Sequence, residues 1–156
     1  MWYHLIFICL ILNSFNSIFS QNDFPEVKII QQKVNNINSS LGQLKISEIQ
    51  KDTLGFKKIY FNDTIQKIEI CSIENRNIEK RVAWFYVNKC PIYIEKNWTD
   101  LKSYKVIDNE KMYLNNKEII LWLDFNDKPV DLNSSENKAV CDRIIDYSKK
   151  TILSLK

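Results

Sequence analysis

Three similar segments follow one another along this 156-residue chain. YFNDTIQKIEI begins at Tyr60, YVNKCPIYIEK at Tyr86 and YLNNKEIILWL at Tyr113. Each segment contains a strand that ends near a Tyr, a pair of turn residues and a second strand rich in Ile. Two β-rich runs separated by a tight turn predict a β-hairpin, and consecutive hairpins build an antiparallel meander.

The turns of these hairpins carry Asn where tight hairpins usually carry Asn-Gly. The predicted turn pairs are Asn62-Asp63, Asn88-Lys89 and Asn115-Asn116. Both central residues of a type I′ turn need positive φ, which Asn tolerates better than most residues other than glycine. Lys89 fits this conformation poorly, which leaves a longer middle turn open.

With the turns placed there, side-chain alternation sorts the strands into two faces. One face is predicted to be the core wall: Ile59, Phe61, Ile68, Ile70, Ala83, Phe85, Val87, Cys90, Ile92, Ile94, Met112, Leu114, Ile119, Leu121 and Leu123. The other face carries rings and charges: Tyr60, Trp84, Tyr86, Tyr93, Tyr113, Trp122, Lys58, Lys67, Glu69, Arg81, Lys111 and Glu118. This pattern is typical of an antiparallel sheet with one buried face and one wetter face.

Helical stripes flank the hairpins. The first stripe has apolar residues spaced by three and four, at Val27, Ile30, Val34, Ile37 and Leu41. Its predicted cap is Asp23 with Glu26, and Gly42 is placed to end the helix. The second stripe is Val140, Ile144, Tyr147, Thr151 and Leu155, preceded by Asn133 and Glu136 at cap spacing. Both stripes predict amphipathic helices.

These patterns together predict an α+β fold. An N-terminal helix precedes an antiparallel β-meander of six or seven strands, which includes a strand within 43–50, and a C-terminal helix follows. Because only one sheet face is predicted to be apolar, both helices are expected to pack on that face.

The first twenty residues contain no Lys, Arg, Asp or Glu. Their apolar run, Leu5 to Leu12, is much shorter than the roughly 20 residues that span a bilayer. We therefore expect a secretory signal at 1–20, a single domain at 21–156, a secreted or periplasmic location and no stable membrane span after cleavage.

Removing this segment would remove His4, the only histidine. Without imidazole, Ser-His and Cys-His nucleophilic pairs and His-ligated metal sites are excluded. The two glycines cannot form a phosphate-binding loop or a dinucleotide fingerprint. Basic and acidic residues alternate, at a net charge of +3, which indicates a solvated surface rather than a nucleic-acid interface. We predict no enzymatic activity, cofactor, metal or nucleic-acid partner.

The aromatic face is the predicted binding surface. It comprises Tyr60, Trp84, Tyr86, Tyr93, Tyr113 and Trp122, flanked by Lys58, Arg81 and Lys111. Tyr and Trp dominate protein-recognition hot spots, so the face predicts a non-catalytic, inhibitor- or immunity-like domain that binds a protein or an envelope polymer. The same rings also fit a purely structural role, as strand formers that stabilise cross-strand pairs.

Two other functions stay open. Asp124, Asp127 and Asp131 in LDFNDKPVDLN could supply the paired carboxylates of a small hydrolase, but a turn followed by a helix cap explains the same residues and is the favoured interpretation. A purely structural envelope subunit would instead show an exposed sheet edge that pairs in a dimer.

Three cysteines lie beyond the predicted signal: Cys71, Cys90 and Cys141. An odd number permits one disulfide. Alternation puts Cys90 on the core wall and Cys71 on the opposite face, so Cys90–Cys141 is the candidate bridge and three buried thiols are the alternative. An exposed Cys71 beside Lys58 or Arg81 would have a lowered pKa and a nucleophilic thiol.

The segments YVNKCPIYIEK and YLNNKEIILWLDFNDKPVD resemble the Tyr-Phe-Asn-Gly-Lys-Leu-Ile hairpins of small secreted bacterial proteins of unassigned function. More loosely, they are similar to MORN-type and antitoxin-component hairpin repeats. The likeness runs from about residue 25 to the end of the chain. It implies an N-terminal helix before a meander, a turn leading to a final helix, and an extracytoplasmic setting, and it assigns no catalytic residue.

Overall fold

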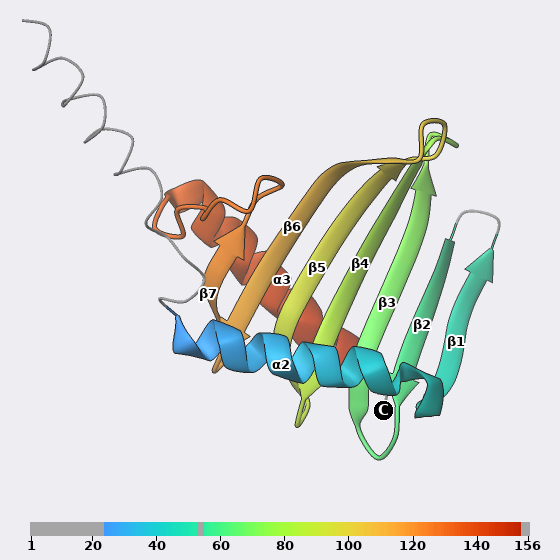
Figure 1. Ribbon diagram of the computed structural model, residues 1–156, viewed down its shortest axis with the longest axis horizontal. Coiled ribbons are helices and arrows are strands. Elements are labelled where there is room, and N and C mark those ends of the chain that lie inside the picture. Colours follow the sequence, from blue (N-terminus) through green and yellow to red (C-terminus); the bar gives the residue numbers. More distant parts are fainter. Residues whose placement is uncertain (1–23, 53–54, 154–156) are drawn as a thin grey trace, which may run out of the picture.

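The computed structural model describes the backbone of residues 24–52 and 55–153 (Figure 1). The elements are α2 (Pro25–Ser40), the 3₁₀ helix η2 (Leu41–Gln43), β1 (Lys45–Asp52), β2 (Gly55–Phe61), β3 (Ile65–Glu74), β4 (Ile78–Val87), β5 (Cys90–Asp100), β6 (Lys105–Asn115), β7 (Glu118–Leu123) and α3 (Ser135–Leu153). The strands form one antiparallel sheet in the order β1 to β7. The predicted α+β meander between two helices is confirmed, and the predicted signal at 1–20 lies outside the described residues.

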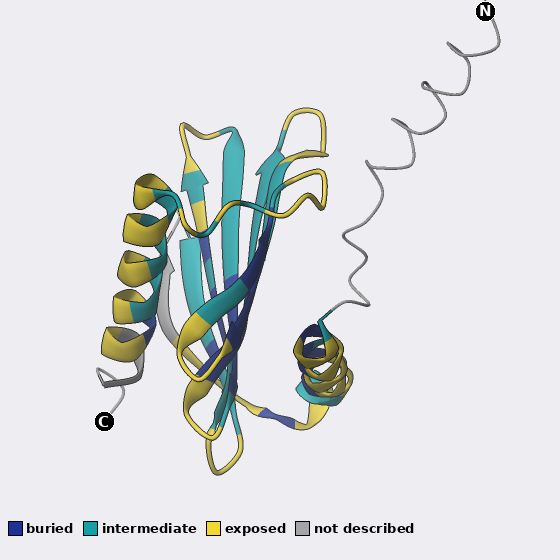
Figure 2. Cartoon of the chain, turned by 90° about the vertical axis from the view of Figure 1, so that its left-hand side faces the viewer, coloured by how far each residue is buried: buried dark blue, intermediate teal, exposed yellow. Residues whose placement is uncertain are grey.

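The two helices lie on opposite faces of the sheet (Figure 2). Val27, Ile30 and Val34 of α2 belong to a cluster with Phe85, Tyr93, Tyr113 and Leu121. On the other face, Val140, Cys141 and Ile144 of α3 pack against a cluster that contains Trp84, Met112 and Trp122. The prediction that both helices share one sheet face is therefore wrong, because both faces of the central strands are apolar and each needs a cover.

Cross-strand register shows which residues share a face. On the α3 side, one row is Ile59, Ile68, Trp84, Ile94, Met112 and Trp122. On the α2 side, the neighbouring row is Tyr60, Lys67, Phe85, Tyr93, Tyr113 and Leu121. The predicted assignment of side chains to the two faces is therefore consistent across β2, β3, β6 and the part of β5 after Ile92. In β4 and most of β7, each side chain lies on the face opposite to the predicted one.

Bulges and turn positions account for the inversions. The register shifts between Phe85 and Tyr86, where β4 meets β5, and between Tyr113 and Leu114, where β6 meets β7. A shift of one residue moves every following side chain to the other face. Alternation counted from the turns therefore gives the wrong face beyond each bulge.

Only one of the predicted turns is in its expected place. Asn88 and Lys89 have φ of 51° and 64°, so the tight middle turn is confirmed and no longer loop is needed. The last turn uses Asn116 and Lys117, one residue later than predicted, with φ of 50° and 71°. The first connection is the three-residue loop 62–64, in which Asn62 N donates to Thr64 O at 3.2 Å.

The helix ends differ in detail from their predicted caps. α2 begins at Pro25, a residue favoured in the first helical turn, after Phe24, which makes no side-chain cap; the predicted cap residue Asp23 lies outside the described part. At α3, Ser134 Oγ accepts a hydrogen bond from Asn137 N at 3.2 Å, so Ser134 caps the helix in place of Asn133. Among the described residues, no helix combines the length and apolarity needed to cross a membrane.

The three described cysteines, Cys71, Cys90 and Cys141, are free thiols. Cys90 pairs across the strands with Val87, which packs toward the α2-side cluster. Cys141 packs into the cluster on the α3 side. The candidate Cys90–Cys141 bridge is wrong because the sheet lies between the two side chains.

Candidate functional site

α2 crosses the sheet near one end of the strands and leaves the rest of that face uncovered (Figure 1). We call this uncovered region the polar face. It comprises Phe56, Lys58, Glu69, Cys71, Glu79, Arg81, Glu95, Asn97, Asn109 and Lys111, which the register places on the α2 side of β2 to β6. Most of these side chains are charged or carry an amide.

A buried carboxylate organises the centre of the polar face. Glu69 is only 8% exposed, and its Oε1 lies 3.2 Å from Arg81 Nη1. Tyr60 OH donates to Glu69 Oε2 at 3.3 Å, and Lys67 Nζ lies 3.8 Å from the same oxygen. Arg81 also donates to Glu79 Oε1 at 3.1 Å. Burial and the Glu69 charge raise the pKa of Tyr60, so the phenol remains a donor to the carboxylate.

Aromatic and thiol groups fill the neighbouring row. The Lys58 ammonium lies 4.7 Å from the centre of the Phe56 ring, and the Arg81 guanidinium lies 5.9 Å from it. Cys71 is buried, and this burial, followed by the charge of Glu79, raises the pKa of its thiol. An exposed thiol was the condition for a nucleophilic Cys71, and the structure does not meet it, because desolvation outweighs the nearby cation.

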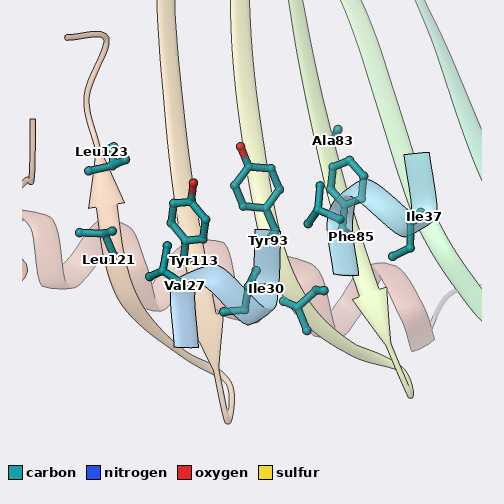
Figure 3. Packing of buried hydrophobic residues seen from close by; sticks show 11 residues of the cluster. Val27, Ile30, Ile37, Ala83, Phe85, Tyr93, Tyr113, Leu121 and Leu123 are labelled. Carbon is teal, nitrogen blue, oxygen red and sulfur yellow. The ribbon is translucent and has the colours of Figure 1, made fainter. Parts of the chain in front are cut away.

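A hollow of about 350 Å³ lies where α2 meets the polar face, lined by Gln31, Val34, Asn35, Tyr93, Lys111 and Tyr113. The Tyr93 and Tyr113 rings are 5.0 Å apart, and both hydroxyls point away from the apolar stripe of α2, toward the uncovered part of the sheet (Figure 3). Gln31 Nε2 donates to Tyr113 OH at 3.1 Å.

The charges around the hollow are largely matched. Lys111 Nζ donates to Asp127 Oδ1 at 2.7 Å, and this hydrogen bond raises the pKa of Lys111. Burial, with a smaller contribution from the Glu95 charge, raises the pKa of Tyr93 far above its ordinary value. The hollow thus presents an ammonium, amides and neutral phenols, groups that suit a hydrogen-bonding ligand.

The structure divides the nine predicted binding residues between the two faces. Tyr60, Tyr93, Tyr113, Lys58, Arg81 and Lys111 lie on the α2 side, whereas Trp84, Tyr86 and Trp122 lie on the α3 side. Trp84, Tyr86 and Trp122 are buried, and so are Tyr93 and Tyr113 beneath α2. The prediction of a single exposed aromatic face is wrong, because its rings lie on both sides of the sheet and each helix covers part of them.

The α3-side aromatics form a core with unsatisfied donors. Trp84 Nε1, Tyr86 OH and Trp122 Nε1 are buried without a hydrogen-bond partner in the described part of the chain. The Trp84 ring contacts the Tyr147 ring at 5.6 Å. These rings stabilise the packing of α3 and are not accessible to a partner.

The three aspartates before α3 organise a loop. Asp124 Oδ1 accepts hydrogen bonds from Asn126 N and Lys128 N, at 2.8 and 2.9 Å. Asp131 Oδ1 accepts one from Asn133 N at 2.9 Å, and Asp127 forms the ion pair with Lys111. The residues that the structure describes contain no group of three His, Cys, Asp or Glu that could hold a metal ion.

Sequence reasoning missed Gln31 and Asn35. Both belong to the polar side of α2, and their only signal is a position beside the apolar stripe. Their part in the hollow follows from where α2 crosses the sheet, which the sequence does not predict. No family model matches this chain, and neither a curated protein nor a solved structure matches it.

Proposed function

We propose that this chain is a non-catalytic, extracytoplasmic binding domain, inhibitor- or immunity-like, that binds a protein or an envelope polymer through the polar face. The observation that carries this proposal is an uncovered sheet face of alternating charges, with a hollow at its α2 end. The extracytoplasmic setting rests on the signal expected at 1–20 and on the resemblance of the hairpins to those of small secreted bacterial proteins.

The polar face suits recognition because its charges are held in place before a partner arrives. Arg81 is fixed by Glu69 and Glu79 while its side chain stays 43% exposed. Lys58 is held over Phe56 and Lys111 by Asp127. Fixed groups lose little conformational entropy on binding, and charges in a set pattern discriminate between partners.

The proposal is tested by neutralising two lysines at opposite sides of this face. Lys58→Gln/Lys111→Gln removes a half-buried cation and one member of a surface ion pair, so the free energy of unfolding should change by less than about 1 kcal/mol. Capture of a partner from secreted or periplasmic extract by the immobilised protein should fall at least tenfold. The matched control is Lys33→Gln/Lys138→Gln, which removes two exposed lysines of the helices and should leave capture unchanged.

Equal capture by the two double variants would refute the polar face as the binding surface. Thermal unfolding of each variant is measured in parallel, so that lost binding is not confused with lost structure. Arg81 is not substituted in this test, because its removal would leave the buried Glu69 carboxylate without its ion-pair partner Arg81 and would therefore destabilise the fold.

A structural envelope subunit is the second candidate, because one edge of the sheet is open. β1 is an edge strand, and Ile46 on it is 57% exposed. The β7 edge is instead covered by the chain that follows it, through Val130 N donating to Trp122 O at 2.8 Å and a bridge between Leu123 and Pro129. An open edge can pair with a second copy, so light scattering that shows a monomer at high concentration would remove this candidate.

A further inference from the structure

The β5–β6 hairpin exposes an apolar tip at the end of the sheet remote from α2 (Figure 1). Tyr104 is 84% exposed, and Val106 and Ile107 are 49% and 46% exposed. Three large apolar side chains therefore face solvent within four consecutive positions. Such a concentration on an otherwise polar surface marks an interaction site more often than isolated exposed residues do.

The local backbone projects these side chains outward. The register shifts between Trp98 and Thr99, which pair with Asp108 and Val106 and leave Ile107 as the extra residue of a bulge. Tyr104 ends the connecting loop with φ of 54°. A bulky aromatic is unfavourable in this left-handed conformation, where Asn or Gly is usual. Local stability therefore does not account for a tyrosine at this position.

Basic side chains surround the tip. Lys102 and Lys105 flank Tyr104, and Arg76 lies in the adjacent β3–β4 turn, which is joined to the tip by Leu101 N donating to Asn77 O at 2.8 Å. Within the described part of the chain, none of these three basic groups makes a salt bridge.

The acidic groups at this end compensate only part of that charge. Glu74 is ion-paired with Lys80 of the neighbouring strand β4, and Glu79, also on β4, is ion-paired with Arg81. Asp100 accepts a hydrogen bond from Lys102 N at 2.8 Å, and this bond lowers the pKa of its carboxyl. Asp108 lies on the α3 side of β6, opposite Trp98. Three basic side chains against Asp100 and Asp108 leave a net charge of +1 at this end, beside the exposed apolar side chains.

We propose that this end of the sheet docks on an anionic lipid surface, with Tyr104, Val106 and Ile107 entering the headgroup region and Lys102, Lys105 and Arg76 contacting lipid phosphates. Tyr favours the membrane interface, and basic residues near an anionic leaflet each strengthen binding about fivefold. A lipid surface is favoured over a protein pocket because three apolar side chains share the β5–β6 tip and basic groups border them on this tip and on the adjacent β3–β4 turn, so that no single protruding side chain dominates. The hydrogen bonds of Asp100 and Asn77 fix both tips in advance.

Co-sedimentation with lipid vesicles tests this proposal. The protein without the expected signal segment 1–20 should bind vesicles of phosphatidylglycerol and phosphatidylcholine, bind pure phosphatidylcholine vesicles at least tenfold more weakly, and dissociate as salt is raised. Tyr104→Asn/Val106→Thr/Ile107→Thr should lower binding to the anionic vesicles at least tenfold. Asn tolerates the positive φ and Thr suits a strand, so the variant should keep the wild-type melting temperature.

The matched control is Ile29→Gln, which removes an apolar side chain on α2 that is 54% exposed and should leave vesicle binding unchanged. Equal binding to both vesicle types, or undiminished binding by the triple variant, would overturn the proposal. The proposal would also be overturned if the protein failed to bind vesicles while the triple variant lost partner capture, since this result would identify the tip as a protein contact. The proposal is independent of the polar face, because Lys58→Gln/Lys111→Gln should bind vesicles normally.

Discussion

Two lysines in the hairpin turns have a strained backbone conformation, and replacing either with glycine should increase the stability of the protein. Lys89 and Lys117 have φ of 64° and 71° and are exposed. A side chain in this left-handed region costs roughly 1–2 kcal/mol, while glycine loses roughly 0.5–1 kcal/mol more entropy on folding. Each Lys→Gly substitution should therefore raise the free energy of unfolding by about 0.5–1 kcal/mol, and the double variant by about twice as much.

The measurement is urea unfolding followed by tryptophan fluorescence, with the denaturant slope compared between variants. An unchanged slope attributes the shift in midpoint to stability. For a chain of this size, a gain of 1 kcal/mol should raise the melting temperature by roughly 2–4 °C.

Asp63→Gly is the control that makes this prediction specific. The sequence places Asp63 in a tight turn like the other two, but in the structure neither Asn62 nor Asp63 has positive φ. Glycine at that position should therefore lower stability by roughly 0.5–1 kcal/mol through entropy alone. If Asp63→Gly stabilises as much as Lys89→Gly, the 62–64 loop is a two-residue turn, and the pairing of β2 with β3 given above is wrong.

Three further perturbations follow from packing and charge. Gly55→Ala would place a Cβ against the backbone of β3 and should lower the free energy of unfolding by about 2 kcal/mol. A Cβ at Gly42 would meet nothing within 4 Å, so Gly42→Ala should leave stability unchanged; urea unfolding compares the two variants. Arg81→Ala should lower the free energy of unfolding by about 2 kcal/mol, because it leaves the buried Glu69 carboxylate poorly paired. Most of that stability should return in Glu69→Gln/Arg81→Met; if this double variant is as unstable as Arg81→Ala, the ion network is contradicted. Burial raises the pKa of Tyr93 in the folded state, so the contribution of Tyr93 to stability is complete below the ordinary tyrosine pKa of about 10 and is lost as the pH rises above it. The free energy of unfolding, measured from neutral to alkaline pH, should fall in the wild type and fall less in Tyr93→Phe.

The number and order of elements were accessible from the sequence because local periodicity carries them. Val27, Ile30, Val34 and Ile37 are all buried, as the helical stripe predicts. The repeated hairpin segments predict a meander, since tight turns force neighbouring strands to pair.

The strand faces were not accessible in the same way. In β4, the consecutive residues Ala83, Trp84, Phe85 and Tyr86 are all buried, because a helix covers each side of the sheet. A strand that is apolar on both sides has no alternation from which to choose a face. The bulges in the β4–β5 and β6–β7 pairs shift the strand register by one residue, and no residue type in the sequence predicts these shifts.

Local sequence patterns are enough to predict two amphipathic helices, a run of hairpins and the charged and aromatic residues from which a binding surface is assembled. Long-range packing places Tyr93 and Tyr113 beside Lys111 and Gln31, and Trp84 and Trp122 in the core under α3. Secondary structure follows from interactions between residues close along the chain. The face on which a side chain lies depends instead on register summed over several strands, and on which side of the sheet each helix covers.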